Sequence, residues 1–274
     1  MNDLPPIRLI VLDIDGTLFN SERVIPDENI RAIHEAQAQG ISVAIATGRF
    51  AENAYLILQK HGLSCTILGM NGSKIIDEKR NVLALHPMSP ETVQAVHSLL
   101  CQVNTNYFSY TEHGLCSGHE DYPHYMEANV EEVKKMEALG YHFKRGREMA
   151  DTFCHQPVLK FYVSNTVPLD EMEPRLSAIP GLSLTRFRDK LIDVMAKGVD
   201  KGFGVRVLAE KMGISLAEVM CIGDDVNDLS MLKTAGWSVA MGNAFEEVKA
   251  VARFHTDTND QCGVAKAIRK YALK

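Results

Sequence analysis

Two aspartates, Asp13 and Asp15, directly follow the apolar run from Leu9 to Leu12. A short run of this composition is typical of a buried strand in a parallel sheet. Side chains alternate along a strand, so both carboxylates point to the same side if the extended conformation continues past Leu12. Two carboxylates this close repel each other unless a cation lies between them, and Mg²⁺ prefers such oxygen ligands. The sequence therefore predicts a magnesium site at this strand end.

Three further segments place polar side chains at the ends of predicted elements. Thr47 and Gly48 follow a second buried-strand run, residues 41–46, and Lys201 opens a predicted helix at about 201–212. Another strand run, residues 218–222, ends in an acidic segment that contains Asp224, Asp225, Asn227 and Asp228. Open α/β sheets bind their ligands at the carboxyl ends of the strands, so we expect these side chains to converge.

Together these residues meet the needs of phosphoryl transfer, which are a nucleophile, an acid/base, a metal that offsets charge and donors for phosphate oxygens. Lys201 supports this interpretation, because a cation at a helix N-terminus is electrostatically unfavourable and calls for a partner. Thr47 also suits a helix cap and could serve both purposes. The side chain of Asp225 is compatible either with support of a bound metal or with a solvated position.

Strand and helix patterns alternate along the first part of the chain, which predicts an α/β fold with crossover helices. The strand runs lie at 9–12, 41–46 and 66–68, and the helical segments at 26–40 and 49–61. This alternation is the reason to expect the polar side chains at one edge of a single sheet.

The pattern changes after the third strand. Asn71-Gly72 and the charged residues 77–81 are turn signals that indicate hairpins, and we place a domain boundary at their end. Residues 103–187 mix strand-like and helical pieces and predict a small α+β module with its own core. The strand-like run from Leu191 to Met195 is assigned back to the first domain.

Composition excludes several classes of function. The 274-residue chain is 46% apolar and 23% charged, as in an ordinary globular protein, and its net charge of −6 argues against a nucleic-acid partner. The six cysteines form no C-x-x-C pair, which argues against a thiolate zinc site, and we expect them reduced in a cytoplasm. No basic-then-apolar leader and no run of membrane-spanning length is present, so neither export nor membrane insertion is expected.

Several motifs, taken in order, carry a resemblance to a known family. They are D-I-D-G-T at residues 13–17, K-G-V-D-K-G, G-D-D-V-N-D, V-A-M-G-N-A and D-Q-C-G-V-A. The chain resembles the haloacid dehalogenase-like phosphatase superfamily, and within it the Cof-type, sugar-phosphatase-like subfamily with a type IIB cap. The resemblance implies a Rossmann-like parallel-sheet core, residues 1–86 and 189–274, with an inserted α+β cap at 87–188.

The resemblance also implies roles for the motif residues. Asp13 would attack phosphorus and form an aspartyl-phosphate, while Asp15 would act as the acid and then the base. Mg²⁺ would be held by Asp13, the backbone carbonyl of Asp15 and Asp224. The phosphate oxygens would be held by Thr47, the Gly48 amide, Lys201 and Asn227, and Asp228 would position Lys201. Asp15 must be protonated for the first step, and we expect the neighbouring like charge to raise its pKa.

The predicted function is that of a Mg²⁺-dependent phosphatase acting on a small phosphorylated metabolite, such as a sugar phosphate or a phosphorylated cofactor. Two alternatives remain open, namely a phosphomannomutase-like phosphomutase with a similar site, and a non-enzymatic phospho-acceptor or sensing module. A receiver-type module has no need of a long cap, which argues against the second. We expect a monomer or small homo-oligomer. Candidate cap contacts to the leaving group are Tyr122, His124, Arg145, Arg147 and Lys160.

Overall fold

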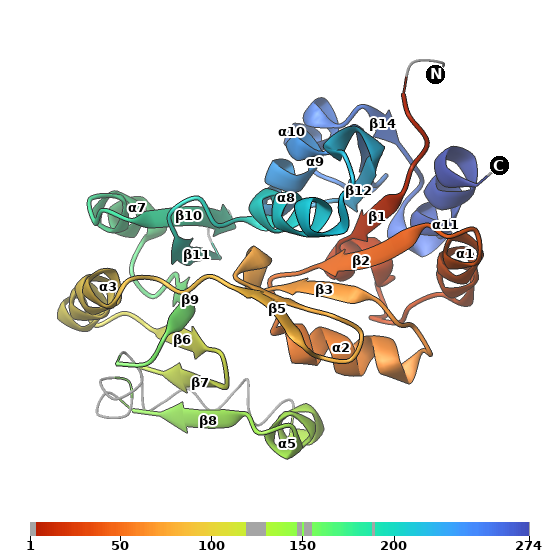
Figure 1. The fold of residues 1–274 in the computed structure, drawn as a ribbon. Helices are drawn as coiled ribbons and strands as arrows, with labels where there is room; N and C mark the ends of the chain where they lie inside the picture. The colour runs from red at the N-terminus through yellow and green to blue at the C-terminus, as the bar shows by residue number, and fades with distance from the viewer. Residues whose placement is uncertain (1–3, 119–129, 147–149, 151–154, 188–189, 274) are drawn as a thin grey trace. The chain divides into compact units, whose positions relative to one another are not determined.

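The computed structural model describes residues 4–118, 130–146, 150, 155–187 and 190–273 (Figure 1). The chain forms two compact units. The core unit comprises Met1–Ala84 and Asp200–Lys274, and the inserted unit comprises Leu85–Val199. The expected fold class, an α/β core interrupted by an α+β insertion, is confirmed.

The core unit is built on an eight-stranded sheet with the order β14-β13-β12-β1-β2-β3-β4-β5. The strands from β14 to β3 pair in parallel, and β4 turns back antiparallel to β3. The strands are β1 Leu9–Leu12, β2 Ser42–Ala46, β3 Thr66–Gly69, β4 Lys74–Ile76, β5 Val82–Leu85, β12 Val219–Gly223, β13 Trp237–Ala240 and β14 Phe254–His255. The antiparallel return at β4 confirms the hairpin predicted after the third strand.

Two helices of the core unit, α1 and α8, begin at residues that suit a helix start. α1 starts after Pro26, and Asp27 and Glu28 in its first turn complement the helix dipole. Asp200 caps α8, its Oδ1 accepting from the Phe203 amide at 2.6 Å, as predicted. The helices are α1 Asp27–Ala38, α2 Ala51–Lys60, α8 Lys201–Met212, α9 Leu229–Thr234, α10 Glu246–Val251 and α11 Gly263–Ala267.

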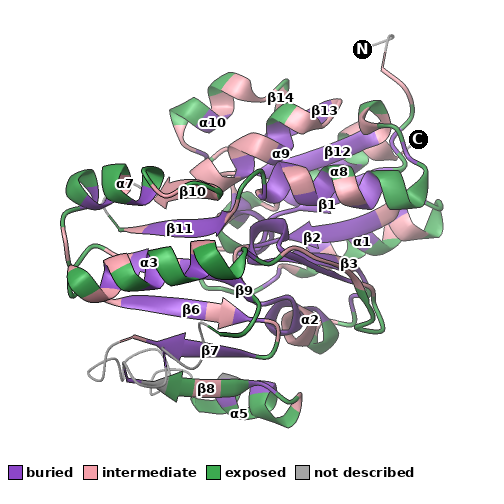
Figure 2. Ribbon diagram, turned by 60° about the vertical axis from the view of Figure 1, so that its left-hand side comes forward, coloured by how far each residue is buried: buried purple, intermediate pink, exposed green. Residues whose placement is uncertain are grey.

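Three neighbouring strands of the core sheet end at the same level. Leu12, the last residue of β1, pairs with Ile222 of β12 on one side and Ile45 of β2 on the other. Figure 2 shows β1, β2 and β12 almost entirely buried, as their apolar runs require. The residues that follow each strand therefore meet at one edge of the sheet.

The inserted unit has a six-stranded sheet with the order β10-β11-β9-β6-β7-β8. Its strands are β6 Tyr107–Thr111, β7 Gly114–Ser117, β8 His142–Arg145, β9 Val158–Ser164, β10 Leu182–Phe187 and β11 Leu191–Ala196. Its helices are α3 Pro90–Gln102, α5 Val130–Ala138 and α7 Leu169–Ser177. The apolar sides of α3 and α7 pack with β9 and β11 in one hydrophobic cluster, and Figure 2 shows the alternating buried and exposed residues of α3.

The assignment of residues 191–195 to the core was wrong. β11 pairs antiparallel with both β9 and β10, so it belongs to the sheet of the inserted unit. Ile192 and Val194 pack into the hydrophobic cluster of that unit, and Asp193 pairs with Lys160 of β9. The inserted unit consequently ends at Val199 instead of residue 188. An apolar strand run reveals burial, but it does not reveal which sheet the strand joins.

No helix among the described residues is both long and apolar enough to cross a membrane.

Candidate active site

Asp13 lies directly after β1 and keeps an extended backbone, with φ −72° and ψ 164°. The residue is only 5% exposed, and its Oδ1 accepts from the Lys201 ammonium at 2.5 Å. Burial raises the pKa of Asp13; Lys201 opposes this effect, while Asp228 and Asp224 add to it, and the pKa stays well above its ordinary value. The Asp13 carboxylate is therefore a buried group whose charge needs more compensation than Lys201 alone supplies.

Asp15 follows a different course from Asp13. The chain turns at Ile14–Leu18, so the Asp15 side chain is half exposed and pairs with Arg49. Arg49 donates from Nε and Nη2 to the two carboxylate oxygens, each at 2.7 Å. Burial by itself raises the pKa of Asp15, but the hydrogen bonds and charge of Arg49 outweigh it, and the pKa is lowered. The expectation that a neighbouring like charge raises this pKa was wrong, because it left Arg49 out.

Lys201 is fully buried at the start of α8, between two carboxylates. Its Nζ donates to Asp13 Oδ1 at 2.5 Å and to Asp228 Oδ1 at 2.6 Å. Burial lowers the pKa of Lys201, but the charges of Asp13 and Asp228 outweigh it and raise the pKa above its ordinary value. The ammonium therefore stays charged. The two carboxylates are the partners that a cation at a helix N-terminus requires.

The carboxylates of Asp13, Asp224 and Asp228 form a group in which one oxygen of each lies within 4.8 Å of the others. Asp224 Oδ1 accepts from the Thr17 hydroxyl at 2.7 Å. Burial, followed by repulsion from Asp228, raises the pKa of Asp224 to about 7. Gly16, at φ +86°, lies so close that a Cβ there would be 2.2 Å from Asp224 Oδ2. Only glycine permits this approach of the turn to the acidic group.

The acidic segment after β12 divides into residues with different partners. Both oxygens of Asp228 are engaged, Oδ1 by Lys201 and Oδ2 by the amides of Asp224 and Asp225 at 2.9 and 3.1 Å. This arrangement suits support of Lys201 and of the turn better than metal ligation. Asp225 caps the 3-10 helix Val226–Asp228, its Oδ1 accepting from the Val226 amide at 2.6 Å. Capping was not among the two uses considered for Asp225 in the sequence.

The remaining predicted site residues lie around this group. Thr47 is 1% exposed after β2, and its Oγ1 accepts from the Arg49 amide at 3.2 Å. This bond lies in the loop before α2, whose N-cap is Phe50, so Thr47 is not the cap of that helix. Gly48 lies between Thr47 and Arg49, half-buried. Asn227 donates from Nδ2 to Asn71 Oδ1 at 3.4 Å. Arg49 and Asn71 were not recognised as site residues in the sequence. Each lies in the loop that follows a strand of the core sheet, β2 for Arg49 and β3 for Asn71.

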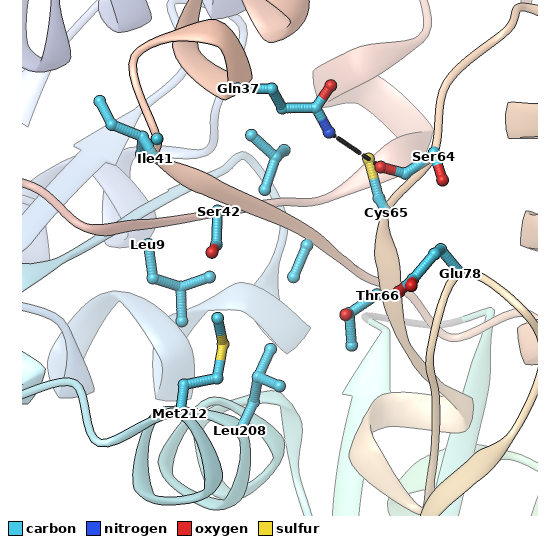
Figure 3. A pocket seen from close by; sticks show the side chains of 13 residues that line it. Leu9, Gln37, Ile41, Ser42, Ser64, Cys65, Thr66, Glu78, Leu208 and Met212 are labelled. Atoms are coloured by element: carbon cyan, nitrogen blue, oxygen red, sulfur yellow. Dashed lines mark hydrogen bonds between the residues drawn. The ribbon is translucent and has the colours of Figure 1, made fainter.

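A separate pocket of about 390 Å³ opens at the opposite edge of the core sheet (Figure 3). Its walls include the first residues of three strands, Leu9, Ser42 and Thr66, whereas the carboxylates lie beyond the last residues. Cys65 lines the pocket, and burial raises the pKa of its thiol to about 12, so it is no nucleophile at neutral pH. The chemistry of the acidic group does not extend to this pocket.

Of the cap residues proposed for leaving-group contacts, only Lys160 has a described side chain. Tyr122, His124 and Arg147 lie outside the described residues, as does the side chain of Arg145. Lys160 is 4% exposed, and its Nζ lies 3.2 Å from Asp193 and 4.7 Å from the centre of the Tyr110 ring. This burial and pairing favour a role for Lys160 within the inserted unit.

Comparison with known proteins connects this geometry to a family. Residues 10–268 match the haloacid dehalogenase-like hydrolases. The 5-amino-6-(5-phospho-D-ribitylamino)uracil phosphatase YcsE of Bacillus subtilis (strain 168) is 34% identical over 267 residues, covering 97% of this chain and 96% of that protein. Phosphatase YwpJ of the same organism is 28% identical over 285 residues, covering 96% of this chain and 99% of that protein.

Solved structures give the same result. The HAD subclass IIB sugar phosphatase BT4131 has a TM-score of 0.83 at 28% identity, covering 97% of this chain and 100% of that chain. A haloacid dehalogenase-like hydrolase from B. subtilis has a TM-score of 0.84 at 26% identity, covering 96% and 99%. These similarities extend through the core and the insertion, and they confirm the Cof-type resemblance read from the motifs. The chain belongs to the haloacid dehalogenase-like hydrolase family.

Proposed function

We propose that this protein is a Mg²⁺-dependent phosphatase that hydrolyses small phosphorylated metabolites through an aspartyl-phosphate on Asp13. The observation that carries the proposal is the buried contact of Lys201 with Asp13 and Asp228, beside Asp224, at the carboxyl ends of β1 and β12. A charged lysine held against a candidate nucleophile offsets the repulsion between an anionic carboxylate and an anionic phosphate. The phosphatase names of the relatives support the same reaction.

The residues present fit a divalent cation. Three carboxylates and one ammonium leave two negative charges in a buried group, which a single divalent cation balances. Burial and mutual repulsion raise the pKa of both Asp13 and Asp224, so the group is strained without a cation. Because the donors are hard carboxylate oxygens, Mg²⁺ suits them. We assign Asp13, Asp224 and the backbone carbonyl of Asp15 as its ligands; bound there, it would offset charge on the phosphate.

The chain's own residues then divide the reaction between them. A carboxylate oxygen of Asp13 attacks phosphorus, and the bond from phosphorus to the leaving oxygen breaks. Asp15 gives its proton to that oxygen and later takes a proton from the water that hydrolyses the aspartyl-phosphate. Phosphate oxygens are held by Thr47, the Gly48 amide, Lys201 and Asn227, while Asp228 keeps Lys201 in place. This assignment follows the geometry of Lys201 and the family resemblance together.

Sugar phosphates and phosphorylated cofactors are the proposed substrate class. The name of the relative YcsE adds 5-amino-6-(5-phospho-D-ribitylamino)uracil to the compounds worth testing. No feature of the described residues favours a phosphomutase or a phospho-acceptor module over hydrolysis. We further propose that the protein works in the cytoplasm, as a monomer or small homo-oligomer, without a nucleic-acid or membrane partner, and the net charge of −6 supports the first exclusion.

The test is release of inorganic phosphate from p-nitrophenyl phosphate and from a panel of sugar phosphates, pyridoxal phosphate and the phosphoribitylaminouracil, with Mg²⁺ or with EDTA. We expect Mg²⁺-dependent release by the wild type and none by Asp13→Asn. Glu246→Gln removes an exposed carboxylate elsewhere and serves as the matched control, with unchanged rates expected. Absence of release from every compound by the wild type with Mg²⁺, or full activity of Asp13→Asn, would overturn the proposal.

A further inference from the structure

The turn that joins β3 to β4 has an uncommon backbone. Met70, Asn71 and Gly72 are consecutive and all have positive φ, at 49°, 54° and 93°. Two of the three carry a Cβ, which makes the left-handed conformation unfavourable for them. Residues in such conformations persist only where the surroundings enforce them, and they concentrate at functional sites. The contacts of this turn therefore call for an explanation.

The backbone of the turn is fastened to the end of β2. The Met70 amide donates to the Arg49 carbonyl at 2.8 Å, and the Asn71 amide donates to the Thr47 carbonyl at 2.9 Å. Thr47 is a proposed phosphate ligand and Arg49 is the partner of Asp15. The turn thus fixes the segment from which both of these side chains project.

The other side of the turn lies against the start of α8. A Cβ on Gly72 would be 2.6 Å from the Asp200 carbonyl oxygen and 3.2 Å from Gly204. Asp200 caps the helix whose first residue is Lys201. A side chain at position 72 would therefore push the turn away from the helix that presents the buried lysine.

The side chain of Asn71 completes the arrangement. It is 1% exposed, and its Oδ1 accepts from Asn227 Nδ2 at 3.4 Å. A side-chain amide carries its donors at one end and its acceptor at the other, so this bond fixes which end of Asn227 faces Asn71. An aspartate at position 71 would keep the acceptor but would add a negative charge beside a site for an anion.

We propose that Asn71 is a positioning residue that orients the amide of Asn227 for phosphate, and that the strained Met70–Gly72 turn holds Asn71 in place for this purpose. The proposal rests on the phosphatase function proposed above and names a residue for it beyond the motif positions. Asn71 acts through Asn227 and through the end of β2, and it takes no part in proton transfer.

The test uses substitutions that distinguish the effect of the Asn71 side-chain amide from the effect of the backbone conformation at this position. Asn71→Gly keeps the left-handed conformation without strain and removes the side chain. We expect a folded protein with a Tm within a few degrees of the wild type, because relief of strain offsets part of the lost hydrogen bond. Its Kd for inorganic phosphate, measured by calorimetry with Mg²⁺, and its KM should rise about two- to tenfold, the loss expected for one hydrogen bond. Asn71→Asp should weaken phosphate binding further. Asn104→Gly, at another left-handed asparagine with φ 53°, is the matched control and should change neither constant.

A double-substitution cycle tests the route of the effect. If Asn71 works through Asn227, Asn71→Gly should change the phosphate Kd less than twofold in an Asn227→Ala background. An unchanged Kd in Asn71→Gly alone, or an equal effect in both backgrounds, would overturn the proposal. Failure of the wild type to release phosphate from any substrate would instead overturn the proposed function, while the phosphate-binding measurements would still decide the role of Asn71.

Discussion

Arg49 binds Asp15 through two hydrogen bonds of 2.7 Å, one to each carboxylate oxygen. Arg49 also donates from Nη1 to Asn53 at 3.2 Å, and its guanidinium lies over the Phe19 ring. The candidate general acid is thus held deprotonated by a fixed partner, although the first step of the proposed reaction needs its proton. For Asp15 to take up a proton during turnover, its pair with Arg49 must loosen or the substrate must compete for it.

The Arg49 pair gives a prediction about pH dependence. In Arg49→Gln the charge that lowers the pKa of Asp15 is gone, so this pKa should rise. The wild-type kcat/KM should decline as pH rises through the pKa of Asp15, and in Arg49→Gln this decline should move to higher pH. Arg49→Lys should lie between them, because lysine keeps the charge but not the two-pronged geometry. The measurement is kcat/KM against pH for an alkyl phosphate.

A substrate with a good leaving group supplies the control for this prediction. p-Nitrophenolate leaves without protonation, so its rate should depend little on the protonation of Asp15. Asp15→Asn should accordingly cost about 10²–10⁴-fold with an alkyl phosphate and much less with p-nitrophenyl phosphate. Equal losses of activity on the two substrates would show that Asp15 is not the general acid. An unshifted pH profile in Arg49→Gln would show that Arg49 does not set the pKa of Asp15.

Asp224 gives a prediction about stability without metal. Its pKa is raised from 3.8 to about 7, so the folded state holds its proton more tightly than the unfolded state does. Stability linked to this group is fully present below pH 3.8 and is lost as the pH rises toward 7. In EDTA, Asp224→Asn should therefore match the wild-type Tm near pH 4 and exceed it at pH 8 by roughly 2–4 °C, the effect of about 1 kcal/mol in a chain of this size.

Added Mg²⁺ should reverse that order. A cation that binds only the folded protein raises its Tm, and Asp224→Asn should lose most of this rise. If the difference in Tm between Asp224→Asn and the wild type in EDTA is the same at pH 4 and pH 8, the raised pKa of Asp224 is contradicted. An equal Mg²⁺ effect on both proteins would instead exclude Asp224 as a ligand.

Gly16 gives a prediction about close approach. Gly16→Ala introduces a Cβ 2.2 Å from Asp224 Oδ2 at a φ of +86°, so it should combine backbone strain with displacement of Asp224. Gly40→Ala is the matched control, because Gly40 has φ +80° and no atom within 4 Å of the added Cβ. Gly40→Ala should cost about 1–2 kcal/mol with normal activity. Gly16→Ala should cost more and lose most of its Mg²⁺-dependent activity; equal behaviour of the two variants would contradict the clash.

The sequence was sufficient to predict that Asp13, Thr47, Lys201 and Asp224 lie close together. Each follows or precedes an element with a clear apolar pattern, and parallel strands place such residues at one edge of a sheet. The family resemblance added roles to these positions.

Pairing between distant side chains could be predicted only where the family resemblance supplied it, as for Asp228 and Lys201. Arg49 stands at the start of a helical segment, where a solvated arginine is ordinary, and nothing in the local pattern indicates that it reaches Asp15. β11 was placed in the wrong sheet for a related reason, since its partner strands are decided by packing of Ile192 and Val194 in the inserted unit. Local patterns report which residues are buried, whereas partners depend on the whole fold.

The buried pair of Lys160 and Asp193 gives the last prediction. Both side chains are at most 5% exposed, and the Lys160 ammonium also lies over the Tyr110 ring. Lys160→Met should leave the Asp193 charge buried without its partner and should lower the free energy of unfolding by about 3–5 kcal/mol. Replacing both, in Lys160→Met with Asp193→Leu, should restore most of this stability, because an apolar pair of similar volume avoids the desolvation of two charges.

Chemical denaturation followed by far-UV circular dichroism measures this stability, and fluorescence of Trp237 gives a second signal from the core unit alone. The same double variant tests whether Lys160 also contacts the leaving group, as the sequence had suggested. If the pair serves only the inserted unit, the double variant should be stable and should keep its kcat/KM on every substrate within about twofold, since no buried charge is left unpaired. A stable double variant that loses activity on some sugar phosphates but keeps it on p-nitrophenyl phosphate would instead show that Lys160 recognises the leaving group.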